Sequence, residues 1–325
     1  MFTHKDIEVR TIFVLNCLEQ ERRLRVQAGE LLLEEITEEK NNTLTKFPFQ
    51  KILALFIIGH ITITTPLIEK CRKFNVALVV MKPNLRPVFY WSDTAEGNYL
   101  LRNKQHSFAE DDLSVARVLI ANKISNQLRC LEKTRKKDEK TLNATLQCKN
   151  ALQIISTAKD HASLLGLEGS TSRIYFSAYF QHLEWIGRKP RIKCDVINVV
   201  LDIGYTILFN FIECFVRMFG FDLYVGVYHR LWFKRKSLIC DLMEPFRCLI
   251  DHTVLLAFNR KQISKRDFEF TKGEYRLKLN KSADYYKLFY NILIEKKMDI
   301  FNYIQKYYRC FMAEKPMDSY PKYLF

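Results

Sequence analysis

Three short segments of the chain carry side chains of the kinds that hold a metal ion. They are Glu168 in LEGSTSRIYF, His229 in VGVYHR, and Asp241 and Glu244 in SLICDLMEPFR. Carboxylates with one imidazole make a hard, mainly oxygen ligand set, which suits Mg²⁺ or Mn²⁺ better than Zn²⁺. Such an ion polarises a phosphoryl oxygen, so the ligand set points to phosphodiester cleavage or strand transfer.

Each of these residues also has a plainer explanation. Glu168 reads as part of a loop entering a helix, where a glutamate favours the helix dipole. Asp241 and Glu244 lie on one side of a helix that the following proline disturbs, with Arg247 as an ion-pair partner. His229 stands among aromatic residues, where an imidazole is more often structural than a ligand.

Basic side chains follow the histidine closely. They are Arg230, Lys234, Arg235 and Lys236. Cations in this density neutralise phosphates, which makes these residues candidate DNA contacts beside whatever the imidazole serves.

The composition favours a polyanionic partner. The 325 residues include 48% hydrophobic and 13% aromatic residues and carry a formal net charge of +15, with a pI near 9.3. This is the electrostatic footprint of a nucleic-acid binder, and an anionic membrane surface is the competing explanation. Residues 196–212 are the most apolar stretch but contain Asn198, Asp202 and Asn210. Because the first residues also lack a signal-peptide core, a soluble cytoplasmic protein without membrane segments is expected.

The cysteines indicate neither a disulfide framework nor a zinc site. There are nine, an odd number, dispersed along the chain without a CxxC motif. Most lie inside apolar patterns, as reduced cysteine does in a protein core.

The hydrophobic pattern predicts an α+β fold with two domains, 1–97 and 98–325. The first is β-rich, with one short helix after Thr64 or Thr65, and prolines in KPNLRPVFYW suggest an edge strand or a linker. From about residue 98 the period becomes helical, with a stripe formed by Leu113, Ala116, Ile120, Ile124 and Leu128.

Three further features are expected in the helical part. The charged run 135–140 suits a solvated helix face or the turn between two long helices. FEFTKGEYRLKL, at 268–279, alternates around Lys272-Gly273 as a β-hairpin does. A final amphipathic helix is expected over roughly 284–312.

The motifs resemble, in their order and intervals, the CRISPR-associated integrases and endonucleases that insert new spacers into CRISPR arrays. The resemblance rests on LEGSTSRIYFSAYF, NVVLDIGYTIL, YHR and SLICDLMEPFR. PFQKILALFIIGHITITTPLIEKC and ALVVMKPNLRPVFYW also look like members from loci with a single large effector nuclease. This chain departs from the family in having Cys248 where a proline is common, and in a bulkier, more basic segment after the histidine.

The resemblance implies the roles of the site residues and the partners. The metal ligands would be Glu168, His229 and Glu244, with Asp241 as a supporting acidic residue and Mg²⁺ or Mn²⁺ as the ion. The β-rich domain would form a homodimer, the helical domain would be catalytic, and a small CRISPR-associated protein with a ferredoxin-like fold would bridge two dimers. The reaction would be transesterification, in which the 3′-hydroxyl of a short DNA duplex attacks a phosphodiester at the edge of a CRISPR repeat.

Two other functions remain open from the residues themselves. A structure-specific endonuclease that cuts branched DNA in repair would need the same ligands. A non-catalytic DNA-binding scaffold would need none of them, so the presence of all three speaks against it.

Overall fold

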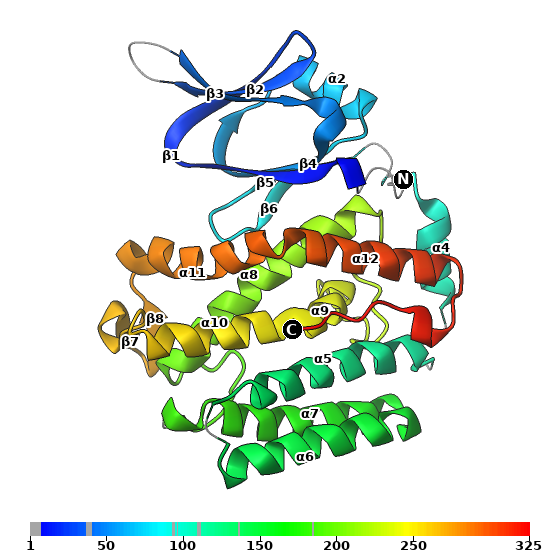
Figure 1. The fold of residues 1–325 in the computed structure, drawn as a ribbon, viewed down its shortest axis with the longest axis vertical. Helices are drawn as coiled ribbons and strands as arrows, with labels where there is room; N and C mark the ends of the chain where they lie inside the picture. The colour runs from blue at the N-terminus through cyan, green and yellow to red at the C-terminus, as the bar shows by residue number, and fades with distance from the viewer. Residues whose placement is uncertain are drawn as a thin grey trace.

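The computed structural model describes residues 8–36, 41–92, 95, 97–108, 112–135, 137–183 and 185–325. Its N-terminal part is a six-stranded sheet, and helices form most of the rest (Figure 1). The strands, in chain order, are β1 (Thr11–Gln27), β2 (Glu30–Ile36), β3 (Asn41–Pro48), β4 (Ile52–Thr62), β5 (Ala77–Met81) and β6 (Pro87–Trp91). The spatial order is β3-β2-β1-β4-β5-β6, with β4 parallel to β1 and β5 and the other pairs antiparallel.

The central strand β4 is buried on both faces. Leu55 and Ile57 join the core beneath the helix α2 (Thr65–Lys73), whereas Phe56 and Ile58 face the helical part. The ring of Phe56 lies 5.2 Å from that of Phe215 in a central helix. Successive side chains of a strand point to opposite faces, so this alternation lets one strand serve two cores.

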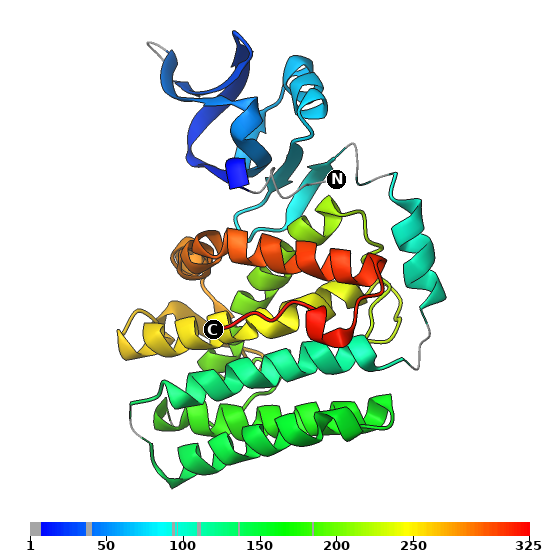
Figure 2. The same ribbon diagram turned by 45° about the vertical axis from the view of Figure 1, so that its right-hand side comes forward.

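The helical part is built from nine helices in the described residues. They are α4 (Tyr99–Ser107), α5 (Ser114–Glu132), α6 (Glu139–Ile154), α7 (His161–Tyr179), α8 (Val196–Met218), α9 (Ser237–Met243), α10 (Arg247–Asn259), α11 (Ser282–Glu295) and α12 (Lys297–Met312). Between α9 and α10 lies the 3₁₀ turn η4 (Glu244–Phe246), and a small hairpin is formed by β7 (Phe268–Thr271) and β8 (Glu274–Leu277). Figure 2 shows α5, α6 and α7 stacked at the end far from the sheet.

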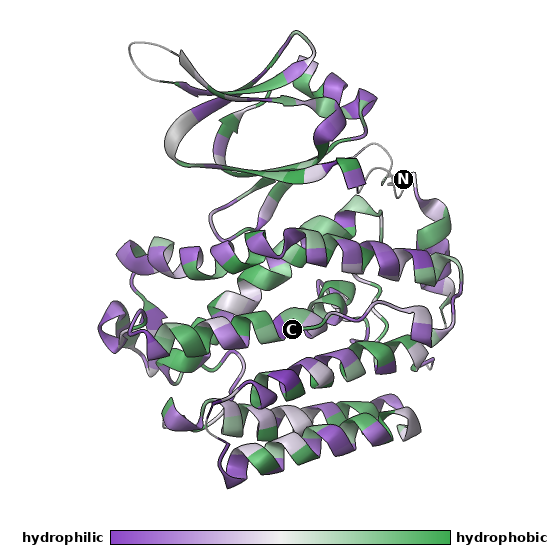
Figure 3. Cartoon of the chain, in the orientation of Figure 1, coloured by the Kyte–Doolittle hydropathy of each residue, from purple (hydrophilic) through white to green (hydrophobic). Residues whose placement is uncertain are grey.

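Helix α8 runs through the middle of this part and is hydrophobic along most of its length (Figure 3). By length and composition it could cross a membrane, but most of it is buried, as in the core helix of a soluble protein. A Cβ on Gly204 would lie 2.5 Å from Cγ2 of Ile250 and 2.7 Å from Cε1 of Phe289. Glycine at this position therefore lets α10 and α11 pack closely on α8.

The α+β class is confirmed, as are the hairpin at Lys272-Gly273 and the turn between two long helices near residue 135. All nine cysteines are free thiols. The single final helix was wrong, because the backbone of Lys296 leaves the helical conformation and separates α11 from α12. Apolar residues on both sides of Lys296 face the core, so the sequence pattern continues across the break.

The predicted loop at Glu168 was also wrong. Asp160 and Ser163 form a capping box that starts α7 at His161, which places Glu168 well inside the helix. The hydroxyl of Thr171 donates to the carbonyl oxygen of Leu167 at 2.7 Å, which satisfies a polar side chain without leaving the helix.

Candidate active site

Two predicted ligands, Glu168 and Glu244, meet at one lysine. Helix α7 carries Glu168, η4 carries Glu244, and α5 supplies Lys123 between them. The Nζ atom of Lys123 contacts Oε1 of Glu168 and lies 2.6 Å from Oε2 of Glu244. Lys123 and Glu244 are buried, with exposed fractions of 9% and 3%. The fold therefore places a positive charge between the two carboxylates.

The carboxylate of Glu244 is held in its charged form. Burial alone would favour the neutral acid, but Arg247, Lys123 and His229 lower the pKa of Glu244 to about 2. The Nε atom of Arg247 lies 2.9 Å from Oε2 of Glu244, so the predicted ion pair between these residues exists. It is a buried contact at the site, and not the solvated surface pair considered as the plainer explanation.

Glu168 is fixed by its own helix. The hydroxyl of Ser172 donates to Oε1 of Glu168 at 2.9 Å, and Nε2 of Gln127 donates to the Ser172 hydroxyl at 3.2 Å. Each glutamate thus uses one oxygen for these contacts. The second oxygens, Oε2 of Glu168 and Oε1 of Glu244, make no hydrogen bond with the residues that the structure describes.

His229 is oriented by Asp241. The Nδ1 atom of His229 lies 2.6 Å from Oδ1 of Asp241. The same carboxylate accepts the backbone N–H groups of Val227, Tyr228 and His229 at 2.7, 3.0 and 2.9 Å. Because a carboxylate in this position acts as an acceptor, Nδ1 carries the ring proton and Nε2 keeps the lone pair that binds a metal.

This contact depends on a glycine. A Cβ on Gly226 would lie 2.6 Å from Oδ2 of Asp241 and 2.9 Å from the carbonyl oxygen of His229. Any larger residue would push the histidine loop away from α9. Asp241 and Glu244, which were predicted to lie side by side on one helix, therefore make different contacts. Asp241 contacts the histidine loop, and Glu244 contacts α5.

The donor set fits a hard divalent ion. As placed, no three His, Cys, Asp or Glu side chains in the described part of the chain are close enough together to enclose one. The two carboxylates nevertheless converge on a cation, the ammonium group of Lys123. An ionised carboxylate, a second one with a free oxygen and an imidazole with a free Nε2 are the ligands that such an ion takes.

Tyr228 belongs to the site and was not predicted. Its side chain is buried, and its hydroxyl has no hydrogen-bond partner among the described residues. Burial, together with the carboxylates of Glu168 and Glu244, raises the pKa of Tyr228, so the phenol stays protonated. The ring lies 5.5 Å from that of His161, at the start of α7.

A cluster of buried polar side chains, formed by Tyr205, Tyr175 and Asp251, lies next to Arg247. The guanidinium of Arg247 lies 4.6 Å from the ring centre of Tyr205. Tyr205 donates to Asp251, as does Tyr175 at 3.2 Å. Burial raises the pKa of Asp251 to about 6 despite these bonds. The cluster thus fixes the cation that holds Glu244.

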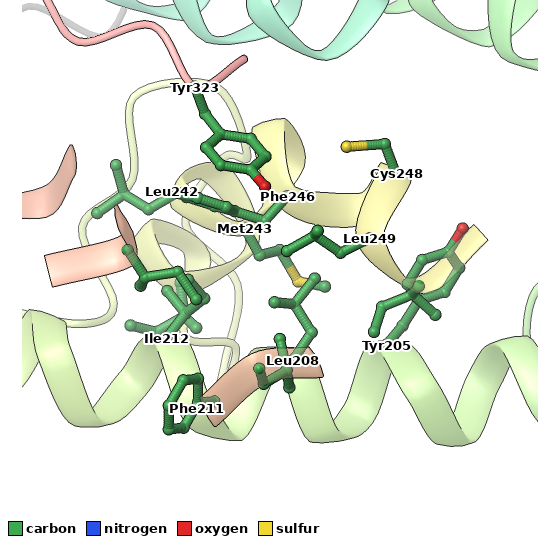
Figure 4. Packing of buried hydrophobic residues seen from close by; sticks show 14 of the residues in the cluster. Tyr205, Leu208, Phe211, Ile212, Leu242, Met243, Phe246, Cys248, Leu249 and Tyr323 are labelled. Atoms are coloured by element: carbon green, nitrogen blue, oxygen red, sulfur yellow. The ribbon is translucent and has the colours of Figure 1, made fainter. Parts of the chain in front are cut away.

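The turn that carries Glu244 rests on distant parts of the chain. Nδ2 of Asn126 in α5 donates to the Pro245 carbonyl at 2.8 Å, and Oδ1 of Asn126 accepts the N–H of Phe325 at 3.1 Å. The ring of Tyr323 lies 4.5 Å from that of Phe246 (Figure 4). The packing below this turn comes from α8, where Leu208, Phe211 and Ile212 are fully buried.

The four basic residues after the histidine do not share one environment. Arg230 and Lys234 are exposed, and Arg235 is half-buried. Lys236 instead lies 2.6 Å from Oε2 of the buried Glu213. Lys236 therefore serves to neutralise an internal carboxylate. Between Arg230 and Lys234 lie Leu231, Trp232 and Phe233, which are also exposed.

Comparison with known proteins decides the family. A family model of the CRISPR associated protein Cas1 matches residues 15–291. The chain belongs to the Cas1 family. It is 28% identical over 298 residues to the CRISPR-associated endonuclease Cas1 1 of Thermodesulfovibrio yellowstonii, which covers 86% of this chain and 92% of that protein. A Cas4/Cas1 fusion of Leptospira interrogans is 30% identical over 337 residues, covering 94% of this chain and 60% of the fusion.

Solved structures share the fold. A chain of a partial Cas6-RT-Cas1–Cas2 complex matches with a TM-score of 0.81 at 21% identity, covering 97% of this chain and 100% of that one. A casposase bound to integration product matches with a TM-score of 0.67 at 19% identity, again over 97% and 100%. The family and the fold class, both predicted from the sequence, are confirmed, and the relatives named as CRISPR-associated endonucleases agree with the predicted function.

Proposed function

We propose that this Cas1-family chain inserts short DNA duplexes into a CRISPR array by metal-dependent transesterification, with Glu168, His229 and Glu244 as the metal ligands. The observation that supports this most is the meeting of two carboxylates around a cation, beside an imidazole whose Nε2 is left free by Asp241. Mg²⁺ or Mn²⁺ is the ion that this set suits.

The chain's own residues do positioning and electrostatic work. When bound, the metal polarises the attacked phosphodiester and makes the attacking 3′-hydroxyl easier to deprotonate. Lys123 holds the two glutamates together, and Asp241 holds the imidazole in one orientation. Phosphoryl transfer depends mainly on such positioning, so few reacting side chains are needed.

The partners are proposed as DNA, a second copy and a small CRISPR-associated protein. Related folds were solved in a Cas1–Cas2 complex and in a casposase bound to integration product, which supports the DNA and protein partners. We assign the homodimer contact to residues 1–97 and the catalytic domain to 98–325, with a ferredoxin-like fold for the small partner. Because the substrate is chromosomal DNA in a prokaryote, we place the protein in the cytoplasm.

One assay tests the reaction. The purified protein is mixed with a short duplex bearing free 3′-hydroxyls and a supercoiled plasmid that contains the repeat, with Mg²⁺, with Mn²⁺ or with a chelator. We expect covalent joining of the duplex to the plasmid only when metal is present. Cutting of branched DNA without joining would support the repair endonuclease, and binding without either reaction would support the scaffold.

A further inference from the structure

Among the described residues, the hydroxyl of Tyr228 is a buried donor without an acceptor. The residue is 3% exposed, and the oxygen makes no hydrogen bond with any of them. Burying an unpaired hydroxyl costs free energy, so an acceptor that reaches this donor would gain a hydrogen bond and remove that cost.

The position of this hydroxyl is fixed from three sides. The N–H of Tyr228 donates to Oδ2 of Asp241 at 3.0 Å, and Nε2 of His161 donates to its carbonyl oxygen at 2.6 Å. The ring lies 5.5 Å from that of His161 and 5.0 Å from that of His229. The phenol therefore cannot turn away without breaking the contacts that orient the histidine.

The ring of Tyr228 lies beside residues of the proposed metal site. It packs on His161, which stands two turns before Glu168 on one side of α7, and it lies 5.0 Å from the ring of His229. A cavity of about 100 Å³ is lined by Tyr228, His229 and Arg230, among others. A buried donor without an acceptor among the described residues is placed there for an acceptor that arrives with the substrate.

We propose that Tyr228 is a further catalytic residue, whose hydroxyl donates a hydrogen bond to a non-bridging oxygen of the phosphodiester held at Glu168, His229 and Glu244. This assignment rests on the proposed function. The bond forms only when DNA is bound, and it strengthens as negative charge builds up on the attacked phosphate. No bond is made or broken at the tyrosine itself.

The test compares two phenylalanine variants. Tyr228→Phe removes the proposed donor, and Tyr303→Phe removes another buried hydroxyl without a hydrogen-bond partner, which packs on Phe246 by its ring. Each variant is assayed for single-turnover strand transfer in Mn²⁺, for Mn²⁺ binding by calorimetry, and for thermal melting without metal.

We expect Tyr228→Phe to slow strand transfer by about 10²-fold, the usual effect of losing one donor to a developing charge. Tyr303→Phe should match the wild type. Both variants should keep the melting temperature and the Mn²⁺ affinity, because neither hydroxyl bonds to the protein.

A sulfur substitution makes the test more specific. A phosphorothioate at the attacked position replaces one non-bridging oxygen with a weaker acceptor. The stereoisomer that places sulfur toward Tyr228 should slow the wild type and Tyr303→Phe, whereas Tyr228→Phe should lose this difference between the two isomers.

The outcomes separate this proposal from the proposed function. An active wild type with an equally active Tyr228→Phe overturns the assignment of Tyr228 alone. Loss of Mn²⁺ binding or of melting temperature in Tyr228→Phe would assign a structural role and also overturn it. A wild type without metal-dependent strand transfer overturns the proposed function and this assignment with it.

Discussion

Nδ1 of His229 lies 2.6 Å from Oδ1 of Asp241, and this carboxylate also accepts the N–H of His229 itself. The side chain of Asp241 thus fixes the position of both the backbone and the ring of His229. At the proposed metal site, Asp241 would act through His229 and would not itself be a ligand.

Replacing Asp241 with asparagine should weaken Mn²⁺ binding by about 10- to 100-fold, because the ring loses the acceptor that fixes its tautomer. Calorimetric titration measures this. Asp222→Asn is the matched control, since Asp222 lies 3.2 Å from Nε2 of His106 and does not pair with His229. Equal Mn²⁺ affinity in both variants would show that Asp241 has no part in metal binding.

Alanine at Glu168, His229 or Glu244 should each abolish strand transfer, and the triple variant should be no worse, because ligands of one ion act as a unit. DNA binding should remain. Glu244→Ala should also lose about 3–5 kcal/mol of stability, since Arg247 would lose its ion-pair partner and Lys123 would keep only Glu168. Glu244→Gln, which keeps the size of the side chain, serves as the second variant. Normal integration by either variant would remove Glu244 from the ligand set.

Lys123→Met should destabilise the metal-free protein by about 3–5 kcal/mol, because the buried Glu244 and the half-buried Glu168 lose their shared cation. Mn²⁺ should raise the melting temperature of this variant more than that of the wild type, since the ion replaces the missing charge. Lys149→Met, at an exposed pair 3.6 Å from Glu132, should change little. If Mn²⁺ gives Lys123→Met no extra stability, the ion does not bind between these glutamates.

Alanine at Arg230 and at Lys234 should weaken DNA binding and reduce the log–log salt slope by about 1 for each phosphate that is no longer neutralised. Lys236→Ala should instead lower the melting temperature, because Glu213 is buried against it. DNA affinity across a salt series, with melting curves, distinguishes the two effects. Unchanged salt slopes in the first two variants would place the exposed cations away from DNA.

Asp251 should make the protein less stable as the pH rises. Its pKa is about 6 in the folded protein against an ordinary value of 3.8, so the folded state binds the proton more tightly than the unfolded state. The contribution of Asp251 is complete below about pH 4 and is lost as the pH passes 6. Asp251→Asn should therefore flatten the pH dependence of urea unfolding over this range. An identical dependence in both proteins would contradict the raised pKa.

The sequence named candidate ligands but not the residues that support them. Glu168, His229 and Glu244 were named from motifs, and the structure brings the two glutamates together at Lys123. Lys123 itself was missed, although a signal existed: it interrupts the buried stripe of α5 next to Ile124. A charged residue at such a position must find a buried partner, but the pattern cannot say which one.

The remaining features of the site and the fold could not be predicted from the sequence, because they depend on packing between segments that are distant in the chain. Tyr228 gains its role only when its loop lies against α7, beside His161. The break at Lys296 leaves the apolar pattern intact, so no local rule separates α11 from α12. Local sequence patterns predict helices and strands. The way in which these helices and strands pack against one another determines which side chains come into contact.

Asn126 joins Pro245 and Phe325, two positions that the ribosome adds at very different times. The turn under Glu244 is therefore not braced until residue 325 has left the exit tunnel. A nascent chain can form α5, α7 and the histidine loop well before that moment, since segments fold as they emerge. The last support of this turn thus comes from a residue 199 positions after Asn126 in the chain.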